Sequence, residues 1–290
     1  MLDCIIVGSG LAGISAALTL QANGNSFQLF GSDLLSNKIF KAEKIHNYPG
    51  LSDISGEEFV NLLKAQLKDA GITVLTQKVA GVYAMKSHFV VMTQSGETFE
   101  SRTVILASGV DNVKEIDGET EFLGRGVSYC ATCDGFLYKG KTIAVLCTSK
   151  ELEHEITYLA NFAKKVYAIP LYKNPQITAQ NVEMIIKKPI AIEGGLKVEK
   201  VVFSRLETAE LKEISVDGMF ILKESVSPAA LVAGLETENG HVKIGRDCST
   251  NLKGCFAAGD CTGRPYQYTK AAGEGNVAAH SVSAYLAEQK

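Results

Sequence analysis

Hydrophobic runs at the start of the chain predict a strand, a glycine turn and a helix. The apolar run Leu2 to Val7 is rich in β-branched residues, and the stretch from Ile14 to Ala22 has helical character. Asn23-Gly24-Asn25 ends this helix, and residues 26–30 return as a second strand. The three segments make a βαβ unit about thirty residues long, which implies a parallel sheet.

The apolar pattern further along the chain predicts more elements of the same class. The expected elements are an amphipathic helix over 57–70, strands within 79–93, a buried strand over 104–107, a second strand–helix–strand unit over 142–147, 152–162 and 166–169, and a helix over 270–286. Residues 111–126 are polar and contain glycine, so we expect the chain to pass between two domains there. The pattern therefore predicts an α/β protein with two doubly wound units.

Composition narrows the class of protein. A chain of 290 residues that is 46% hydrophobic can bury more than one core. Its formal net charge of -3 gives no field that would attract nucleic acid or anionic lipid, and no apolar run approaches a membrane span. Seven cysteines, an odd number, argue against a secreted disulfide framework. We expect a cytoplasmic protein without nucleic-acid or membrane partners.

The turn Gly8-Ser9-Gly10-Leu11-Ala12-Gly13 has the spacing of a dinucleotide-binding motif. Its first glycine allows a tight turn, its second lets the backbone approach a pyrophosphate, and its third permits close packing of helix and strand. The start of the helix then offers free N–H groups to the phosphates. Because the motif follows a strand and opens a helix, dinucleotide binding is favoured over a purely structural glycine turn.

Three further positions are candidate contacts for the dinucleotide. An acidic residue for the ribose is expected about 20 positions after the motif, and Asp33 stands there, in a loop beyond the second strand. Simple exposure of Asp33 to solvent is the alternative. Gly109 follows the end of a buried strand, where a ligand could approach the backbone, and Val79 begins the alternating segment.

Cys130 and Cys133 form a CxxC pair. Two sulfurs at this spacing can close a small-ring disulfide, and such pairs often contain one strongly nucleophilic thiol. Zinc binding is one alternative, but zinc takes four N or S ligands, and the sequence has no second CxxC or closely spaced pair of histidines. Asp134 follows directly. Its carboxyl group could exchange the proton that thiol chemistry needs, or it could cap the next turn.

Cys130-Ala131-Thr132-Cys133-Asp134-Gly135, preceded by Gly126-Val127-Ser128, closely resembles the active site of low-molecular-weight thioredoxin reductases. Three other segments resemble the FAD motifs of the same family: the glycine turn at residues 8–13, Asn47-Tyr48-Pro49-Gly50, and Gly259-Asp260 with Ala272-Gly273. The resemblance therefore spans nearly the whole chain.

The resemblance implies an architecture and a set of partners. It implies two Rossmann-like three-layer domains: a discontinuous FAD-binding domain from residues 1–112 and 240–290, and an inserted domain from residues 113–239 that carries the CxxC pair. It also implies FAD as cofactor, thioredoxin as partner and a homodimer.

Roles for individual residues follow from the resemblance as well. Cys133 would face the flavin, Cys130 would attack the disulfide of the partner, and Asp134 would be the nearby acid. Asp260, Gln267 and Tyr268 would line the isoalloxazine ring. The full set of cofactor-binding candidates is Gly8, Ser9, Gly10, Ala12, Gly13, Asp33, Lys38, Asn47, Val79, Gly109, Gly259, Asp260, Gln267 and Tyr268.

The chain departs from the family where the family binds NADPH. Cys147-Thr148-Ser149-Lys150-Glu151 replaces the second glycine motif, and Pro170-Leu171-Tyr172-Lys173 replaces the paired arginines for the 2′-phosphate. A Cβ then stands where a pyrophosphate needs the backbone, and the guanidinium groups that would hold the 2′-phosphate are missing. This combination resembles the ferredoxin-dependent flavin thioredoxin reductases.

We therefore predict that reduced ferredoxin supplies electrons one at a time to FAD, which passes them as a pair through the CxxC to thioredoxin. Ferredoxins are typically acidic, so a basic surface should meet them, and Lys38, Lys41 and Lys44 are the first candidates. These lysines could instead form a solvated face or touch FAD phosphates. The alternatives for the whole protein are a diflavin oxidoreductase with a second FAD in the degenerate site, an NADPH-dependent thioredoxin reductase with an atypical site, and a non-catalytic redox sensor.

Overall fold

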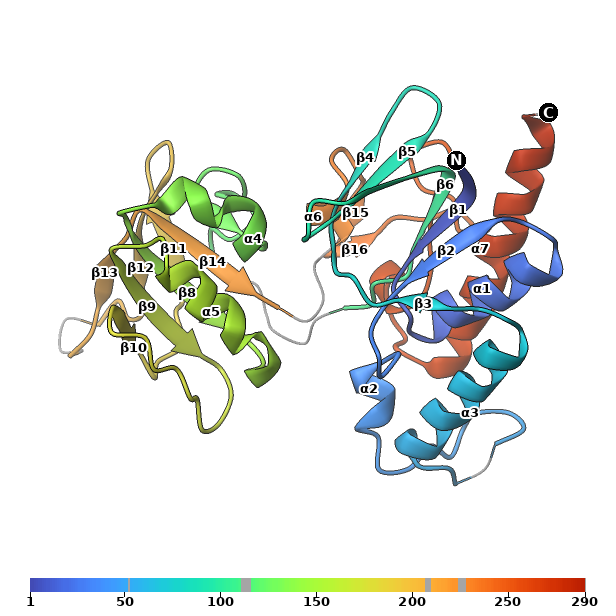
Figure 1. The fold of residues 1–290 in the computed structure, drawn as a ribbon, viewed down its shortest axis with the longest axis horizontal. Coiled ribbons are helices and arrows are strands. Elements are labelled where there is room, and N and C mark those ends of the chain that lie inside the picture. The colour runs from blue at the N-terminus through green and yellow to red at the C-terminus, as the bar shows by residue number, and fades with distance from the viewer. Residues whose placement is uncertain (52, 111–115, 207–209, 224–227, 290) are drawn as a thin grey trace. The chain divides into compact units, whose positions relative to one another are not determined.

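The chain folds into two compact units. The computed structural model describes residues 1–51, 53–110, 116–206, 210–223 and 228–289. The first unit contains Met1–Val110 and Ser227–Lys290, and the second contains Asp111–Val226. Both chain termini lie in the first unit (Figure 1).

The division into compact units differs from one predicted domain boundary, and the other boundary cannot be compared. The chain returns to the first unit at residue 227, not at the predicted residue 240. The reason is a set of long-range contacts, because Val232 forms a parallel bridge with Val82 and residues 228–231 pack on the same strand. The predicted boundary between residues 112 and 113 lies outside the described residues.

The first unit is built around one large sheet. Its elements are β1 (Leu2–Val7), α1 (Leu11–Ala22), β2 (Phe27–Phe30), α2 (Asn37–Phe40), α3 (Gly56–Asp69), β3 (Val74–Leu75), β4 (Val79–Ala84), β5 (Phe89–Thr93), β6 (Thr98–Leu106), α6 (Pro228–Leu231), β15 (Thr237–Glu238), β16 (His241–Val242), β17 (Cys255–Ala257), a 3-10 turn η3 (Asp260–Thr262) and α7 (Tyr268–Glu288). The sheet order is β3-β2-β1-β6-β5-β4, with β17 also paired to β6. The strands β3, β2, β1, β6 and β17 are parallel, as the βαβ pattern predicts, and β4 and β5 run antiparallel.

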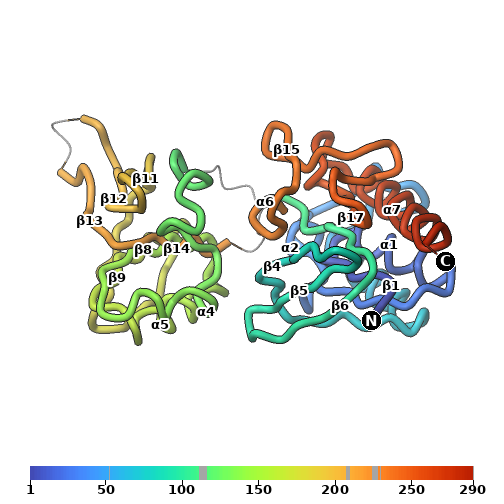
Figure 2. Tube along the Cα trace, turned by 90° about the horizontal axis from the view of Figure 1, so that it is seen from above, coloured from blue at the N-terminus to red at the C-terminus, as the bar shows by residue number. Residues whose placement is uncertain are grey.

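Alternation along β1 places a helical layer on one face of this sheet. Cys4 and Ile6 are fully buried in a core that also contains Ile14 of α1, Phe59 of α3 and Val282 of α7. The helices α1 and α7 lie side by side in both views (Figures 1 and 2), which brings the two ends of the chain together in one layer.

The second unit has three layers. Its elements are β7 (Val127–Ser128), α4 (Ala131–Asp134), η1 (Gly135–Tyr138), β8 (Thr142–Cys147), η2 (Lys150–Leu152), α5 (Glu153–Ala160), β9 (Lys165–Pro170), β10 (Val182–Met184), β11 (Ala191–Gly194), β12 (Val198–Val202), β13 (Glu213–Ser215) and β14 (Gly218–Leu222). A five-stranded parallel sheet has the order β10-β9-β8-β14-β7, and β11, β12 and β13 form a separate antiparallel sheet. Successive residues of β8 enter different cores: Val145 packs with Ile156 of α5, and Leu146 packs with Val201 of β12.

A buried ion pair joins the first and last parts of the second unit. Lys223 Nζ lies 2.5 Å from Glu119 Oε1, and the two side chains are 7% and 1% exposed. Glu119 also accepts hydrogen bonds from the Tyr129 hydroxyl at 2.8 Å and from the Ile116 N–H at 3.0 Å. The carboxylate is therefore held by a charge and two donors, as a buried carboxylate requires.

Among the residues that the structure describes, no helix combines the length and the apolar character that a bilayer crossing requires.

Candidate functional site

Cys130 and Cys133 are joined by a disulfide around the short helix α4. Their Cα atoms are 5.3 Å apart, and Cys130 Sγ accepts a hydrogen bond from the Cys133 N–H at 3.1 Å, so Cys130 caps the helix. Cys130 is 9% exposed, whereas Cys133 is exposed. Within the described ranges, no group of three or more His, Cys, Asp or Glu side chains is arranged to hold a metal ion. The disulfide and its helix cap place the pair for thiol–disulfide chemistry.

Asp134 ends the same helix and is held close to the pair by Ser128. The Ser128 hydroxyl donates to Asp134 Oδ2 at 2.6 Å and accepts from the Cys130 N–H at 3.1 Å. The serine is 5% exposed and belongs to β7, which pairs with β14 in the sheet. Sequence analysis named Ser128 as part of the family motif but gave it no role, because its contact with Asp134, six residues later, depends on the fold.

The glycine turn of the first unit has the shape of a pyrophosphate cradle. A Cβ on Gly8, whose φ is +114°, would lie 2.3 Å from the Ala107 oxygen, and one on Gly13 would lie 1.8 Å from the Gly8 oxygen. A Cβ on Gly10 would meet nothing within 4 Å. Gly10 is the N-cap of α1, and in the described structure this end has no side-chain cap and no acidic residue in its first turn. The two tight glycines shape the turn, and the open one leaves room for phosphates.

The carboxy-terminal loop packs directly on this cradle. A Cβ on Gly259 would lie 2.9 Å from the Ala12 Cβ, and one on Gly275 of α7 would lie 2.0 Å from the Ala12 oxygen. Gly259 has a φ of +89°, which favours glycine. Both glycines are therefore needed where the two ends of the chain meet.

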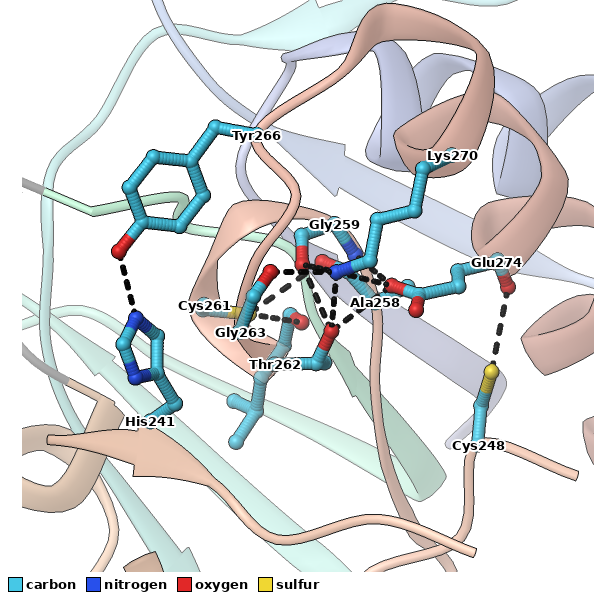
Figure 3. Close-up of polar contacts among 11 residues, drawn as sticks. His241, Cys248, Ala258, Gly259, Cys261, Thr262, Gly263, Tyr266, Lys270 and Glu274 are labelled. Atoms are coloured by element: carbon cyan, nitrogen blue, oxygen red, sulfur yellow. Dashed lines mark hydrogen bonds and ion pairs between the residues drawn. The ribbon is translucent and has the colours of Figure 1, made fainter. Parts of the chain in front are cut away.

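Lys270 and Glu274 hold the loop that follows Gly259 (Figure 3). Lys270 Nζ donates to the carbonyl oxygens of Gly259 and Gly263, each at 2.8 Å, and to the Thr262 hydroxyl at 2.7 Å. The Glu274 carboxylate accepts from the Gly259 N–H at 2.8 Å and lies 3.1 Å from Lys270 Nζ. Sequence analysis missed this pair, because its i, i+4 spacing is also typical of a solvated helix face.

Several predicted cofactor residues are brought together near the same loop. Lys38 of α2 lies 3.5 Å from the Asp260 carboxylate. The Asn47 amide donates to Gln267 Oε1 at 2.9 Å. Tyr268, the first residue of α7, packs on a core ring, with 6.5 Å between its ring centroid and that of Phe59. Segments about 220 residues apart in sequence therefore converge here.

Of the other candidates, Ser9, Asp33 and Gly109 follow the carboxyl ends of the parallel strands β1, β2 and β6. Ser9 Oγ donates to the Leu35 oxygen at 2.7 Å and accepts from the Ser32 N–H at 3.0 Å, so it fixes the turn that contains Asp33. Asp33 lies beyond β2, as predicted; its side chain is exposed and borders a cavity of about 350 Å³. Gly109, with a φ of +69°, follows β6. Val79 begins β4, where its side chain is buried and its backbone pairs with Thr93.

This arrangement fits FAD, because the open Gly10 and the uncapped start of α1 leave room and N–H donors for a diphosphate, and Gly259 of the held loop packs on the same turn. The residues that would hold the diphosphate are those of the 8–13 turn, and the polar groups that would meet the ring are Asp260 and Gln267. When bound, FAD supplies electron transfer to a disulfide.

The five remaining cysteines are buried thiols. Burial raises the pKa of Cys4, Cys248, Cys255 and Cys261 to about 12 and the pKa of Cys147 to about 11. Cys261, next to Asp260, donates to the carbonyl oxygens of Ala258 at 3.3 Å and Leu106 at 3.4 Å, so it acts as a packing residue of the loop.

Known proteins resemble this chain along nearly its whole length. Residues 2–275 match the family described as pyridine nucleotide-disulphide oxidoreductase. A thioredoxin reductase from Helicobacter pylori is 34% identical over 99% of this chain and 99% of its own. A crystal structure of a ferredoxin-flavin thioredoxin reductase from Clostridium acetobutylicum is 44% identical, with a TM-score of 0.89, and covers 99% of this chain and 98% of its own. A thioredoxin reductase structure from Gloeobacter violaceus is 29% identical, with a TM-score of 0.80, and covers 100% of this chain and 95% of its own.

Proposed function

The chain belongs to the thioredoxin reductases of the pyridine nucleotide-disulphide oxidoreductase family, which are FAD flavoproteins, and on this premise we propose that it takes its electrons from reduced ferredoxin. The electrons pass through FAD to the Cys130–Cys133 disulfide and from there to the disulfide of thioredoxin. The ferredoxin-flavin enzyme of Clostridium acetobutylicum, at 44% identity, supports this choice of donor.

The observation that carries the proposal is a bond between Glu153 and Tyr172. The Tyr172 hydroxyl and the Gln176 N–H both donate to Glu153 Oε1 at 2.9 Å. Glu153 is the first residue of α5, where a nucleotide diphosphate would approach, and Tyr172 follows β9, where 2′-phosphate recognition is expected. The two halves of the nucleotide site are thus tied to each other by side chains of the protein.

Charge also disfavours a nucleotide at this position. The first turn of α5 carries Glu153 and Glu155, and Glu151 of the preceding turn η2 accepts a hydrogen bond from the Ser149 hydroxyl. Carboxylates at the start of a helix already complement its dipole and repel phosphate groups. The same groups would repel the diphosphate of a second FAD, so this arrangement supports one flavin per chain.

The reduced pair would carry out thiol–disulfide exchange. The Cys130 thiolate attacks one sulfur of the thioredoxin disulfide and forms a mixed disulfide, and Cys133 then attacks Cys130 Sγ and releases dithiol thioredoxin. Two electrons and two protons leave the pair and arrive on thioredoxin. Asp134, held beside the pair by Ser128, is placed to exchange these protons.

A basic, aromatic group on the first unit is a candidate surface for ferredoxin. The exposed ring of Tyr266 has Arg264 Cζ at 5.2 Å and Lys38 Nζ at 5.9 Å from its centroid. Its hydroxyl is hydrogen-bonded to His241 Nε2 (Figure 3), and the two atoms are 2.6 Å apart. Gln267, a proposed flavin contact, is the next residue. An acidic iron–sulfur protein that docks on these cations would stand beside the proposed flavin site.

The lysines that share a spacing of three residues do not form one stripe. The helix α2 ends at Phe40, so Lys41 and Lys44 lie beyond it, and both are exposed. Only Lys38 of the three reaches Tyr266 and Asp260 among the contacts of the described residues. We therefore centre the docking proposal on Lys38 and Arg264.

An anaerobic flavin spectrum tests the donor. We expect reduced ferredoxin to bleach the oxidised flavin band rapidly and to generate thiols on added thioredoxin, while NADPH leaves the band unchanged. As a control, photoreduction should show that the bound flavin can be reduced. Rapid bleaching by NADPH alone would overturn the proposal.

Two measurements separate the remaining alternatives. Extraction of flavin should give one FAD per chain, whereas a diflavin enzyme gives two. Thiol formation under turnover distinguishes an enzyme from a redox sensor. Homodimer assembly and a cytoplasmic location are further parts of the proposal, tested by light scattering and by cell fractionation.

A further inference from the structure

We propose that Ser128 is a positioning residue that keeps Asp134 hydrogen-bonded in both of its protonation states, so that this carboxyl group can relay protons during thiol–disulfide exchange. The inference rests on the proposed function, because it concerns the same pair of cysteines. Its basis is the set of three contacts made by one buried hydroxyl.

Ser128 is fixed more firmly than the residues it holds. It is 5% exposed, and its strand β7 pairs in parallel with β14, where Ser128 lies opposite the fully buried Phe220. Asp134, by contrast, ends a helix of only four residues, and Cys130 is the N-cap of this helix. When the disulfide opens, its covalent closure of the helix is lost. The bonds to Ser128 do not depend on the disulfide and remain.

The hydroxyl of Ser128 has partners for either state of Asp134. Oγ lies 2.6 Å from Asp134 Oδ2, 3.3 Å from the Cys130 oxygen, and 3.1 Å from the Cys130 N–H nitrogen. A hydroxyl donates one hydrogen and accepts two. With Asp134 ionised, Ser128 donates to the carboxylate and accepts from the Cys130 N–H. With Asp134 protonated, Ser128 accepts from both and turns its hydrogen to the Cys130 oxygen.

No buried polar group therefore loses its partner when Asp134 gains or loses a proton. An unsatisfied buried group would cost about 1–3 kcal/mol and would favour one state over the other. The proton balance of the exchange needs both states. Asp134 takes a proton as each cysteine thiol becomes a thiolate nucleophile, and it returns that proton to the thiolate that leaves the partner disulfide.

The other ionisable groups near Asp134 make contacts of their own. Tyr138 of η1 has a pKa raised by burial and also by Asp134 and Asp217, so its phenol stays protonated at neutral pH. Lys141 Nζ lies 5.2 Å from the centroid of that ring. On α5, which packs on α4, Glu155 is buried and acts on Cys147. The Asp134 carboxylate accepts a hydrogen bond from the Ser128 hydroxyl.

The test is the pH profile of exchange with a small disulfide by the holoprotein after reduction with dithiothreitol. Removing the donor takes away the hydrogen bond that holds the Asp134 carboxyl group beside the pair. We expect Ser128→Ala to change the acidic limb of the profile and to slow exchange at neutral pH about tenfold. Ser128→Thr, which keeps the hydroxyl, should restore the parent profile.

A second set of variants separates the loss of this hydrogen bond from general damage to the fold. Asp134→Asn should abolish the limb, and adding Ser128→Ala to it should change the profile no further, since the serine acts through the carboxyl group. A Ser128→Ala profile that overlays the parent profile, or a Thr variant as impaired as the Ala variant, would overturn the inference. Because the assay uses neither ferredoxin nor thioredoxin, a protein that shows the limb but fails with those partners contradicts only the proposed function.

Discussion

The side-chain amide of Asn47 donates to Gln267 Oε1 at 2.9 Å and so joins the two ends of the chain at the proposed flavin site. We predict that Asn47→Ala weakens FAD binding several-fold, because the loss of one such bond is worth about 1 kcal/mol. Titration of the apoprotein with FAD measures this effect. Asn23→Ala is the matched control, since the Asn23 amide makes a bond of similar exposure to Ser283 at 3.0 Å elsewhere in the unit. Equal effects of the two variants would contradict the placement of the flavin.

The glycine turn allows fold and cofactor binding to be separated. Gly10→Ala should leave the free energy of unfolding of the apoprotein within about 1 kcal/mol, because its Cβ meets nothing within 4 Å. The same change should raise the dissociation constant for FAD about tenfold or more. Gly13→Ala should instead destabilise the apoprotein by about 3 kcal/mol, because its Cβ would lie 1.8 Å from the Gly8 oxygen. Denaturant unfolding and FAD titration check both, and a Gly10 variant that binds FAD normally would argue against a diphosphate there.

The buried thiols predict how labelling and stability depend on pH. In the oxidised protein, a thiol reagent at mildly alkaline pH should modify the five buried cysteines only slowly, and reduction should expose Cys133 to rapid labelling.

The ordinary thiol pKa is 9.0, and burial raises it to about 12 in Cys4, Cys248, Cys255 and Cys261. The unfolded chain therefore releases these protons first, so stability should fall as pH rises from 9.0 toward 12. Rapid labelling of the oxidised native protein would contradict this burial.

Arg264 tests the proposed docking surface. Arg264→Glu should raise the KM for ferredoxin about tenfold at low salt, and added salt should reduce the difference, because the interaction is between exposed charges. Photoreduction of the flavin should be unchanged. Lys86→Glu is the matched control, since Lys86 is exposed on the turn between β4 and β5 of the same unit. Equal effects of the two reversals would mean that total charge, and not this surface, governs the encounter.

Sequence patterns identified the parts of the fold that depend on local periodicity. The strand at residues 142–147 has the predicted limits, because a continuous apolar run buried on both faces has no polar position at which to end early. The βαβ unit and the terminal helix also appear where they were expected. The return to the first unit was misplaced, because residues 228–232 are assigned there by packing against β4 and not by any local signal.

Sequence analysis predicted the motifs of the candidate site better than the residues that hold those motifs in place. The glycine positions, the CxxC pair and Asp134 can be read from spacing. The roles of Ser128, Lys270 and Glu274 cannot, because each acts through partners that only the folded chain brings near. The absence of a nucleotide motif was visible in the sequence, but the Glu153–Tyr172 bond, which joins the two segments concerned, was not.

The ion pair between Lys223 and Glu119 has an evolutionary consequence. These residues stand beside the two places where the chain passes between its units, and the pair holds both places together inside the second unit. A segment whose ends are fastened to each other can be exchanged as a cassette, because its replacement need not disturb the host that receives it. Residues 116–223, which carry the CxxC pair, therefore form a segment that can be exchanged as a whole, whereas the surface proposed for ferredoxin stays with the first unit.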